Sequence, residues 1–118
     1  MGTKPKNEPK AAATPFAQAT VQHAQALQAR TIRDVQIVSR IVTALGLRPP
    51  IKPATPLSRL LGGDANNWDI ALMLMAYPSF KHDGLVLQKG DAMDADTLGD
   101  MGDLVFAWYA SDGWTIQT

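Results

Sequence analysis

Thirty consecutive residues, 16–45, contain neither glycine nor proline, the two residues that most often interrupt a helix. Thr14 and Pro15 precede this stretch as a natural N-cap and first helical residue, and Gly46 follows it as a natural stop. The pattern predicts one long α-helix over residues 15–46, roughly 45 Å in length. A helix of that length would dominate the architecture of so short a chain.

The apolar residues of this predicted helix follow a heptad spacing that is weak at first and strong in the second half. Four of them would form the seam that packs the helix on a core or on another chain: Val35, Val38, Val42 and Leu45. The first half, rich in glutamine and alanine, would project or contact another chain. A helix that simply crosses a globular core is an equal alternative, because a coiled coil needs three or four good repeats.

Two segments on either side of the helix are expected to be extended. Residues 1–14 have no large apolar side chain after the first residue to offset the entropy of ordering them, so we interpret them as a basic arm that carries Lys4, Lys6 and Lys10. Four prolines within ten residues make 47–56 a stiff proline-rich strap. The strap would connect the helix to a small compact acidic module.

That module, residues 57–118, is expected to contain one buried helix. The asparagines at 66–67 can cap it, its apolar residues occupy nearly all of its circumference, and Pro78 follows its end. Core packing is the simpler role for such a helix. Because methionine adapts to irregular surfaces, Met73 and Met75 are also candidate contacts with a partner.

The C-terminal part favours β-structure in this interpretation. Residues 85–87 suit a short strand, and residues 104–109 and 114–117 suit a hairpin whose turn would be formed by residues 112–113. A helix over residues 100–110 is the alternative, since the same apolar residues also fit a period of 3.6. The predicted fold class is therefore α+β, with an arm, one long helix, a strap, a buried helix and a short C-terminal hairpin.

The charges divide between the two halves of the chain. Residues 1–60 hold nine basic and two acidic side chains, whereas residues 61–118 hold two basic and nine acidic ones. The formal net charge of zero therefore conceals a strong asymmetry. Such a division favours contacts between one copy of the chain and the next, or with other charged partners.

Five aspartates lie within thirteen residues of the acidic half: Asp91, Asp94, Asp96, Asp100 and Asp103. Several carboxylates on a flexible loop could bind a calcium or magnesium ion, although the ligand spacing of an EF-hand is absent. The other interpretations are a solvated acidic loop and a docking surface for a basic partner.

The chain offers few residues for catalysis. It has no cysteine, which excludes disulfides, thiolate nucleophiles and cysteine-bound metals. His82 beside Asp83 could form half of an acid–base pair, yet no serine lies in a nucleophile motif. We therefore expect a non-enzymatic protein without a cofactor.

Nucleic-acid binding is an alternative function. Arg30, Arg33 and Arg40 lie on roughly one face of the predicted helix and could, with the lysines of the arm, follow a nucleic-acid backbone. No aromatic residue is interleaved with them to stack on bases. A solvated helix face explains the same arginines more simply.

No segment of the sequence is typical of a membrane protein. The longest strongly apolar run covers residues 70–77, far short of the roughly 20 residues that span a bilayer. The N-terminus is polar, unlike the apolar region of a signal peptide. We expect a cytoplasmic or virion protein.

The expected function is a structural or assembly role, in which a small subunit binds its own copies or neighbouring proteins. Phage head, neck and tail accessory proteins are often built from such parts, which is an analogy of architecture. The arm would dock on the acidic loop of the next subunit. The apolar seam would supply most of the affinity, because exposed ion pairs contribute only about 0 to 1 kcal/mol each.

Overall fold

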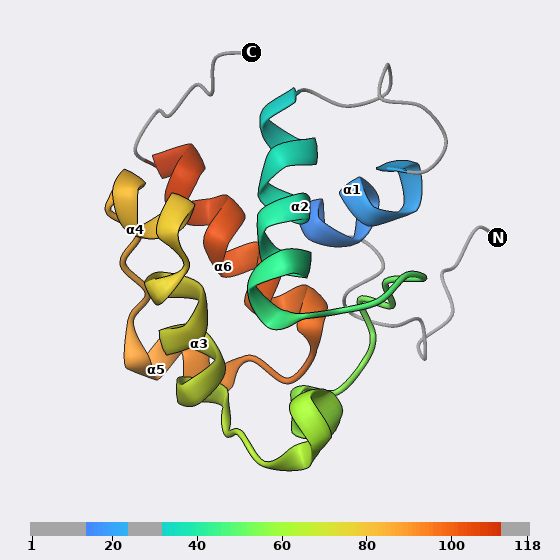
Figure 1. The fold of residues 1–118 in the computed structure, drawn as a ribbon, viewed down its shortest axis with the longest axis vertical. Helices are drawn as coiled ribbons and strands as arrows, with labels where there is room; N and C mark the ends of the chain where they lie inside the picture. Colours follow the sequence, from blue (N-terminus) through green and yellow to red (C-terminus); the bar gives the residue numbers. More distant parts are fainter. Residues whose placement is uncertain (1–13, 24–31, 112–118) are drawn as a thin grey trace, which may run out of the picture.

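A computed structural model describes residues 14–23 and 32–111 of the chain, and every regular element within these ranges is helical (Figure 1). The elements follow in this order: α1 (Pro15–His23), α2 (Ile32–Leu45), the 3₁₀ helix η3 (Leu57–Gly63), α3 (Asn67–Ala76), α4 (Pro78–Asp83), α5 (Lys89–Asp94) and α6 (Leu98–Ser111). Within the described ranges, β-type pairing is limited to an isolated antiparallel bridge between Pro56 and Thr97.

The predicted α+β class is wrong, because the described part of the chain forms helices and no strand. Residues 104–109, expected in a hairpin, belong to α6, which matches the alternative helix over residues 100–110. A reciprocal cap opens this helix: Asp100 Oδ2 accepts from the Thr97 N–H at 3.3 Å, and Thr97 Oγ1 accepts from the Asp100 N–H at 3.1 Å. The rest of the predicted hairpin, residues 112–117, lies outside the described residues.

The predicted strand at residues 85–87 is an irregular connection between α4 and α5. Leu85 and Leu87 are buried while Val86 is 54 % exposed, which is the alternation that suggested a strand. The Leu87 N–H donates to Met75 Sδ at 3.3 Å instead of to a neighbouring strand. A connection that packs against the core can therefore alternate buried and exposed residues without belonging to a sheet.

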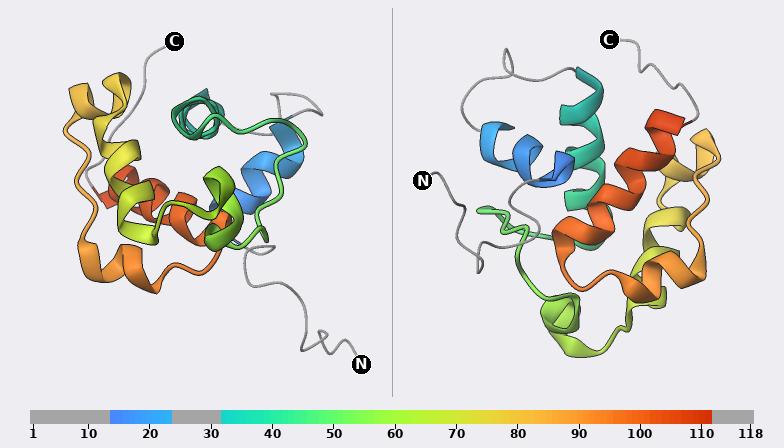
Figure 2. Two further views of the ribbon diagram at one scale, coloured as in Figure 1. Left: turned by 60° about the horizontal axis from the view of Figure 1, so that its bottom comes forward. Right: turned by 180° about the vertical axis from the view of Figure 1, so that it is seen from behind.

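The single long helix predicted over residues 15–46 is also wrong, because α1 and α2 pack against each other and both pack against α6 (Figure 2). Phe16 and Ala19 of α1 share one core with Ile37 and Ile41 of α2. One straight helix could not bring its two halves into contact. The weak and strong parts of the heptad spacing thus belong to two helices that bury different faces.

Phe16 anchors α1 on α6. Its ring is fully buried and meets Phe106 edge-on, with the ring centroids 6.3 Å apart. The ring lies over Gly102, where an added β-carbon would come within 2.3 Å of Phe16 Cδ1. The missing side chain of Gly102 is therefore what allows α1 to approach α6 so closely.

The predicted buried helix is α3, and its capping by Asn66 is confirmed. Asn66 Oδ1 accepts from the Asp69 N–H at 2.8 Å, and Asp69 Oδ2 accepts from the Asn66 N–H at 3.1 Å. Only one side of α3 is buried, through Ile70, Ala71 and Leu74. The opposite side faces outward although its residues are also apolar.

The proline-rich strap runs from α2 to η3 and is tied to the start of α6. The Leu98 N–H donates to the Thr55 carbonyl oxygen at 2.8 Å, and the Gly99 N–H donates to that of Pro53 at 2.8 Å. These bonds satisfy backbone donors in the first turn of α6 that the helix itself cannot satisfy. They also hold the strap in a fixed position beside α2.

Candidate functional site

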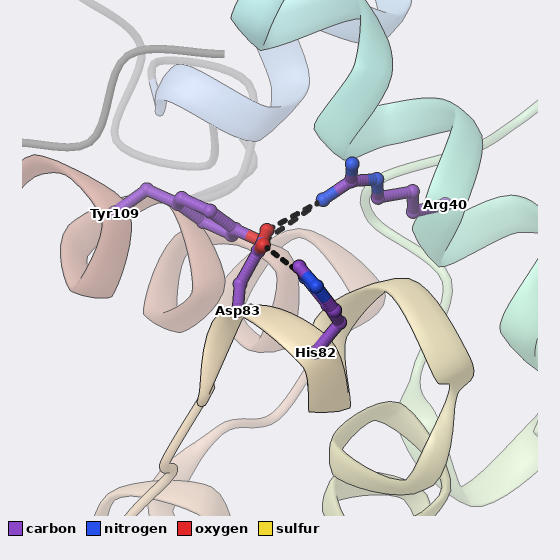
Figure 3. Close-up of polar contacts among 4 residues, drawn as sticks. All are labelled: Arg40, His82, Asp83 and Tyr109. Carbon is purple, nitrogen blue, oxygen red and sulfur yellow. Dashed lines mark hydrogen bonds and ion pairs between the residues drawn. The ribbon is translucent and has the colours of Figure 1, made fainter.

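A polar cluster joins three helices at Asp83 (Figure 3). Asp83 ends α4, Arg40 belongs to α2 and Tyr109 to α6. The Tyr109 O–H donates to Asp83 Oδ2 at 2.6 Å, and Arg40 Nη1 donates to the same oxygen at 2.9 Å. Arg40 Nη1 also donates to Tyr109 Oη at 3.1 Å, and the guanidinium lies 5.9 Å from the centroid of the Phe80 ring. We call this group the Asp83 cluster.

The contacts of the Asp83 cluster shift the pKa values of Asp83 and Tyr109. Burial alone would raise the pKa of Asp83, but the hydrogen bonds from Tyr109 and Arg40 outweigh burial and hold this pKa below its ordinary value. Burial and the hydrogen bond to Asp83 raise the pKa of Tyr109. At neutral pH the carboxylate is therefore charged and the phenol keeps its proton. This arrangement suits a clamp between three helices better than proton exchange with a substrate.

The predicted acid–base pair of His82 and Asp83 is a long contact at the surface. His82 Nδ1 lies 3.5 Å from Asp83 Oδ1, and the His82 side chain is 89 % exposed. The other carboxylate oxygen of Asp83 already accepts from Tyr109 and Arg40. The carboxylate is thus positioned mainly by α2 and α6 and not by the histidine.

The lowered pKa of Asp83 predicts a specific dependence of stability on pH. The stabilisation that the charged carboxylate provides is fully present above the unfolded-state pKa, near 3.8, and is lost as the pH falls through the lower pKa of the folded state. Asp83→Asn should therefore flatten the loss of unfolding free energy with falling pH in this acidic window. Urea denaturation at a series of pH values measures it, and equal slopes for both proteins would contradict the assignment.

An apolar groove of about 390 Å³ lies between α1, α2 and the strap. No charged side chain is among its lining residues: Thr20, Val21, Val38, Ser39, Val42, Thr43, Pro49, Pro50 and Ile51. Val21, on the α1 wall, is 63 % exposed. The two prolines have fixed φ angles, so the wall that the strap provides is stiff. We call this surface the α1–α2 groove.

The four predicted seam residues of α2 divide between the core and this groove. Val38 and Leu45 are buried, and Val42 packs against the same core while half-buried. Val38 and Val42 also line the groove. Val35 is half-buried. The seam residues therefore pack α2 mainly on the protein's own core. Two of them also form part of the wall of the α1–α2 groove.

A second apolar surface is the outer face of α3, formed by Leu72, Met73 and Ala76. Leu72 is 44 % and Met73 37 % exposed, and Ala76 is exposed as well. Met75, the other predicted contact, points inward and packs against the core. The two methionines are neighbours on opposite sides of one helix, so of the two only Met73 presents its side chain to a partner.

The predicted aspartate cluster is distributed over several structural roles. Asp91 and Asp94 are exposed on α5, and Asp96 is exposed in the connection to α6. Asp100 caps α6, while Asp103 Oδ1 accepts from the first backbone N–H of α1 after Pro15 at 2.9 Å. Burial raises the pKa of Asp103, although its hydrogen bonds oppose this shift. Across residues 14–23 and 32–111, no three His, Asp or Glu side chains are placed to hold one metal ion.

Four of these aspartates line an acidic hollow of about 290 Å³: Asp91, Asp94, Asp100 and Asp103. Thr14, the last residue of the predicted basic arm and the part of it that the structure describes, lines the same hollow. The C-terminal end of the predicted arm therefore lies next to the acidic hollow.

Four of the predicted basic contact residues lie outside the described residues: Lys4, Lys6, Lys10 and Arg30. Arg33 lies 3.6 Å from Asp34, measured from Nη2 to Oδ1. Arg40 is held in the Asp83 cluster, with its side chain only 23 % exposed. The described arginines of α2 are thus paired with carboxylates of their own chain, which leaves less basic surface for a nucleic acid than the sequence suggested.

Sequence reasoning missed both the Asp83 cluster and the α1–α2 groove. Arg40 and Asp83 are 43 residues apart, and Asp83 and Tyr109 are 26 apart, so no local spacing connects them. The available signal was Arg40, which lies among the apolar residues of the second half of the predicted helix, where a carboxylate partner is needed. The groove depends on the packing of α1 against α2, which a single straight helix does not contain.

Comparison with known proteins gives no match: no protein-family model matches the chain, and neither does any curated protein or solved structure. In the part of the chain that the structure describes, no helix has both the length and the apolar character needed to cross a bilayer.

Proposed function

We propose that this protein is a non-enzymatic assembly subunit whose copies associate head to tail, with the outer face of α3 of one copy seated in the α1–α2 groove of the next. The observation that carries the proposal is that one small fold exposes both a concave and a convex apolar surface. Exposed apolar surfaces of this kind commonly mark contact sites.

The positions of the two surfaces support a head-to-tail contact. α1 and the strap lie on one side of the fold and α3 on the other, in every view of Figures 1 and 2. Because the two surfaces differ, a contact between them is heterologous, and such contacts produce rings or filaments. A helix laid in an apolar groove is a recurring mode of protein recognition, and Leu72 and Ala76 have the four-residue spacing it uses.

Apolar burial would supply most of the affinity in this assembly. Burying a fully exposed valine, leucine or methionine side chain contributes about 1.5 to 3 kcal/mol. Val21, Leu72 and Met73 are partly exposed and would bury the remainder of their surface on contact. The groove lining has no charge that would have to be desolvated.

Charges would orient the copies. The lysines of the arm and the acidic hollow of a neighbouring copy are complementary, although each exposed pair adds only about 0 to 1 kcal/mol. A cytoplasmic or virion setting, such as a phage head, neck or tail, suits a subunit of this kind by analogy of architecture.

Sedimentation velocity over a range of protein concentrations tests the proposal. The mass of the wild-type protein should increase with concentration. Val21→Glu, in the groove, and Leu72→Glu, on α3, should each prevent this increase, because each places a charge within an apolar contact. Both positions are exposed, so the fold should tolerate the substitutions.

Ala54→Glu is the matched control, since Ala54 is exposed on the strap and does not line the groove. This variant should associate like the wild type. A wild-type protein that stays monomeric at every concentration would exclude self-assembly, and an equal loss in all three variants would exclude the proposed surfaces.

A further inference from the structure

A small hollow that carries positive charge lies on the strap, next to the α1–α2 groove. It measures about 140 Å³ and shares Pro50 and Ile51 of its lining with that groove. Arg48, Lys52 and Thr55 also line it, and no acidic residue is among its lining residues. We call this surface the basic hollow. The stiff wall of the apolar groove therefore continues directly into two positive charges.

The two cations of the basic hollow are available to a partner. Arg48 and Lys52 are exposed, and neither side chain forms an ion pair or a hydrogen bond with another described residue. The backbone beneath them is held in place, because the Thr55 N–H donates to the Lys52 carbonyl oxygen at 3.0 Å and the Thr55 carbonyl oxygen accepts from the Leu98 N–H of α6 at 2.8 Å. The hollow therefore presents its charge from a fixed position.

The outer face of α3 carries the complementary charge. Asp69, Leu72, Met73 and Ala76 are spaced as i, i+3, i+4 and i+7, so they lie along one side of the helix, and all four are exposed. Asp69 is the only charged residue of α3 and stands one turn before Leu72 and Met73. This face thus begins with a carboxylate and continues as an apolar stripe. The strap side of the fold offers the matching pair of surfaces, a basic hollow and an apolar groove.

We propose that Asp69 of one copy binds between Arg48 and Lys52 of the next copy, and that this contact fixes the direction in which α3 lies in the α1–α2 groove. The inference rests on the proposed head-to-tail assembly. Asp69 Oδ2 accepts from the Asn66 N–H at 3.1 Å, and a carboxylate has further lone pairs for donors of a partner. Apolar packing does not by itself distinguish the two directions of a helix, whereas an ion pair at one end favours one of them.

Sedimentation velocity at low salt, where exposed charges are least screened, tests this contact. Replacing both cations, Arg48→Gln with Lys52→Gln, should weaken self-association about threefold to tenfold. Asp69→Asn should have a similar effect, and its amide oxygen can still accept from the Asn66 N–H, so α3 keeps its cap. All three substitutions together should weaken association no further than either change alone, because the same contact is lost only once.

Arg59→Gln with Lys89→Gln is the matched control, since it removes two exposed positive charges that line neither the basic hollow nor the α1–α2 groove. This variant should associate like the wild type. If Val21→Glu prevents association but the charge variants have no effect, additive effects or only the effect of the control, the pairing is wrong and the assembly stands. A wild-type protein that stays monomeric would overturn the assembly and the pairing together.

Discussion

Replacing Phe16 with alanine is expected to lower the free energy of unfolding by about 3 to 5 kcal/mol, the usual cost of truncating a buried aromatic side chain. The Phe16 ring is fully buried against Phe106 and closes the space above Gly102. Because α1 is one wall of the α1–α2 groove, the loss of its anchor should also weaken self-association. Urea denaturation measures the first effect and sedimentation velocity the second.

Two further variants make this prediction specific. Val21→Ala changes an exposed residue of the same helix and should alter stability by no more than about 0.5 kcal/mol. Gly102→Ala should destabilise the wild type, because its β-carbon would overlap Phe16, but should be tolerated in the Phe16→Ala protein. If Phe16→Ala were as mild as Val21→Ala, α1 could not be docked on α6 as described.

Asp83→Asn is expected to cost about 2 kcal/mol, because it leaves the Arg40 guanidinium without its carboxylate. Removing one partner of a fully buried ion pair costs about 3 to 5 kcal/mol. Arg40 keeps 23 % of its side-chain surface exposed, so water compensates for part of this loss. Equilibrium denaturation at neutral pH measures the cost.

A double-mutant cycle separates the ion pair from its surroundings. Arg40→Met removes the other charge, so the double variant should lose less stability than the two single variants together. His82→Ala, at a side chain that is 89 % exposed, should change stability little. Strict additivity of Asp83→Asn and Arg40→Met would mean that the Asp83 cluster does not couple α2 to α4.

Local signals in the sequence identified the starts of two helices correctly. α1 begins at Pro15 behind Thr14, whose side-chain oxygen accepts from the Ala17 N–H at 3.3 Å. α3 begins behind Asn66 with the expected cap. Capping depends on residues three positions apart, so neighbouring side chains are sufficient to predict it.

The predicted C-terminal hairpin is an error that arises where two local patterns were both possible. Residues 104–109 fit a strand and a helix equally well by period, and contacts distant in sequence favour the helix. Asp103 of α6 accepts a hydrogen bond from the Phe16 backbone, 87 residues away, and Gly102 provides the space for the Phe16 ring. These contacts join α6 to residues that are far away in the sequence. A short stretch of neighbouring residues therefore does not reveal them.

The structure shows where part of the charge asymmetry of the sequence lies. The acidic half contributes a hollow lined by four aspartates, and Thr14, at the C-terminal end of the predicted arm, lies in its lining. Two basic residues of α2, Arg33 and Arg40, are instead paired with carboxylates of the same chain. These two arginines are therefore engaged within the chain, and the apolar surfaces remain the main candidates for partner contacts.

The mass of a mixture of two blocked variants tests the head-to-tail assembly most directly. Val21→Glu disables the groove and keeps the outer face of α3, whereas Leu72→Glu does the reverse. Each variant alone should be monomeric by sedimentation velocity. An equimolar mixture should form a one-to-one dimer and nothing larger, because only one groove and one α3 face are intact in each pair. A mixture that stays monomeric would contradict the proposed contact.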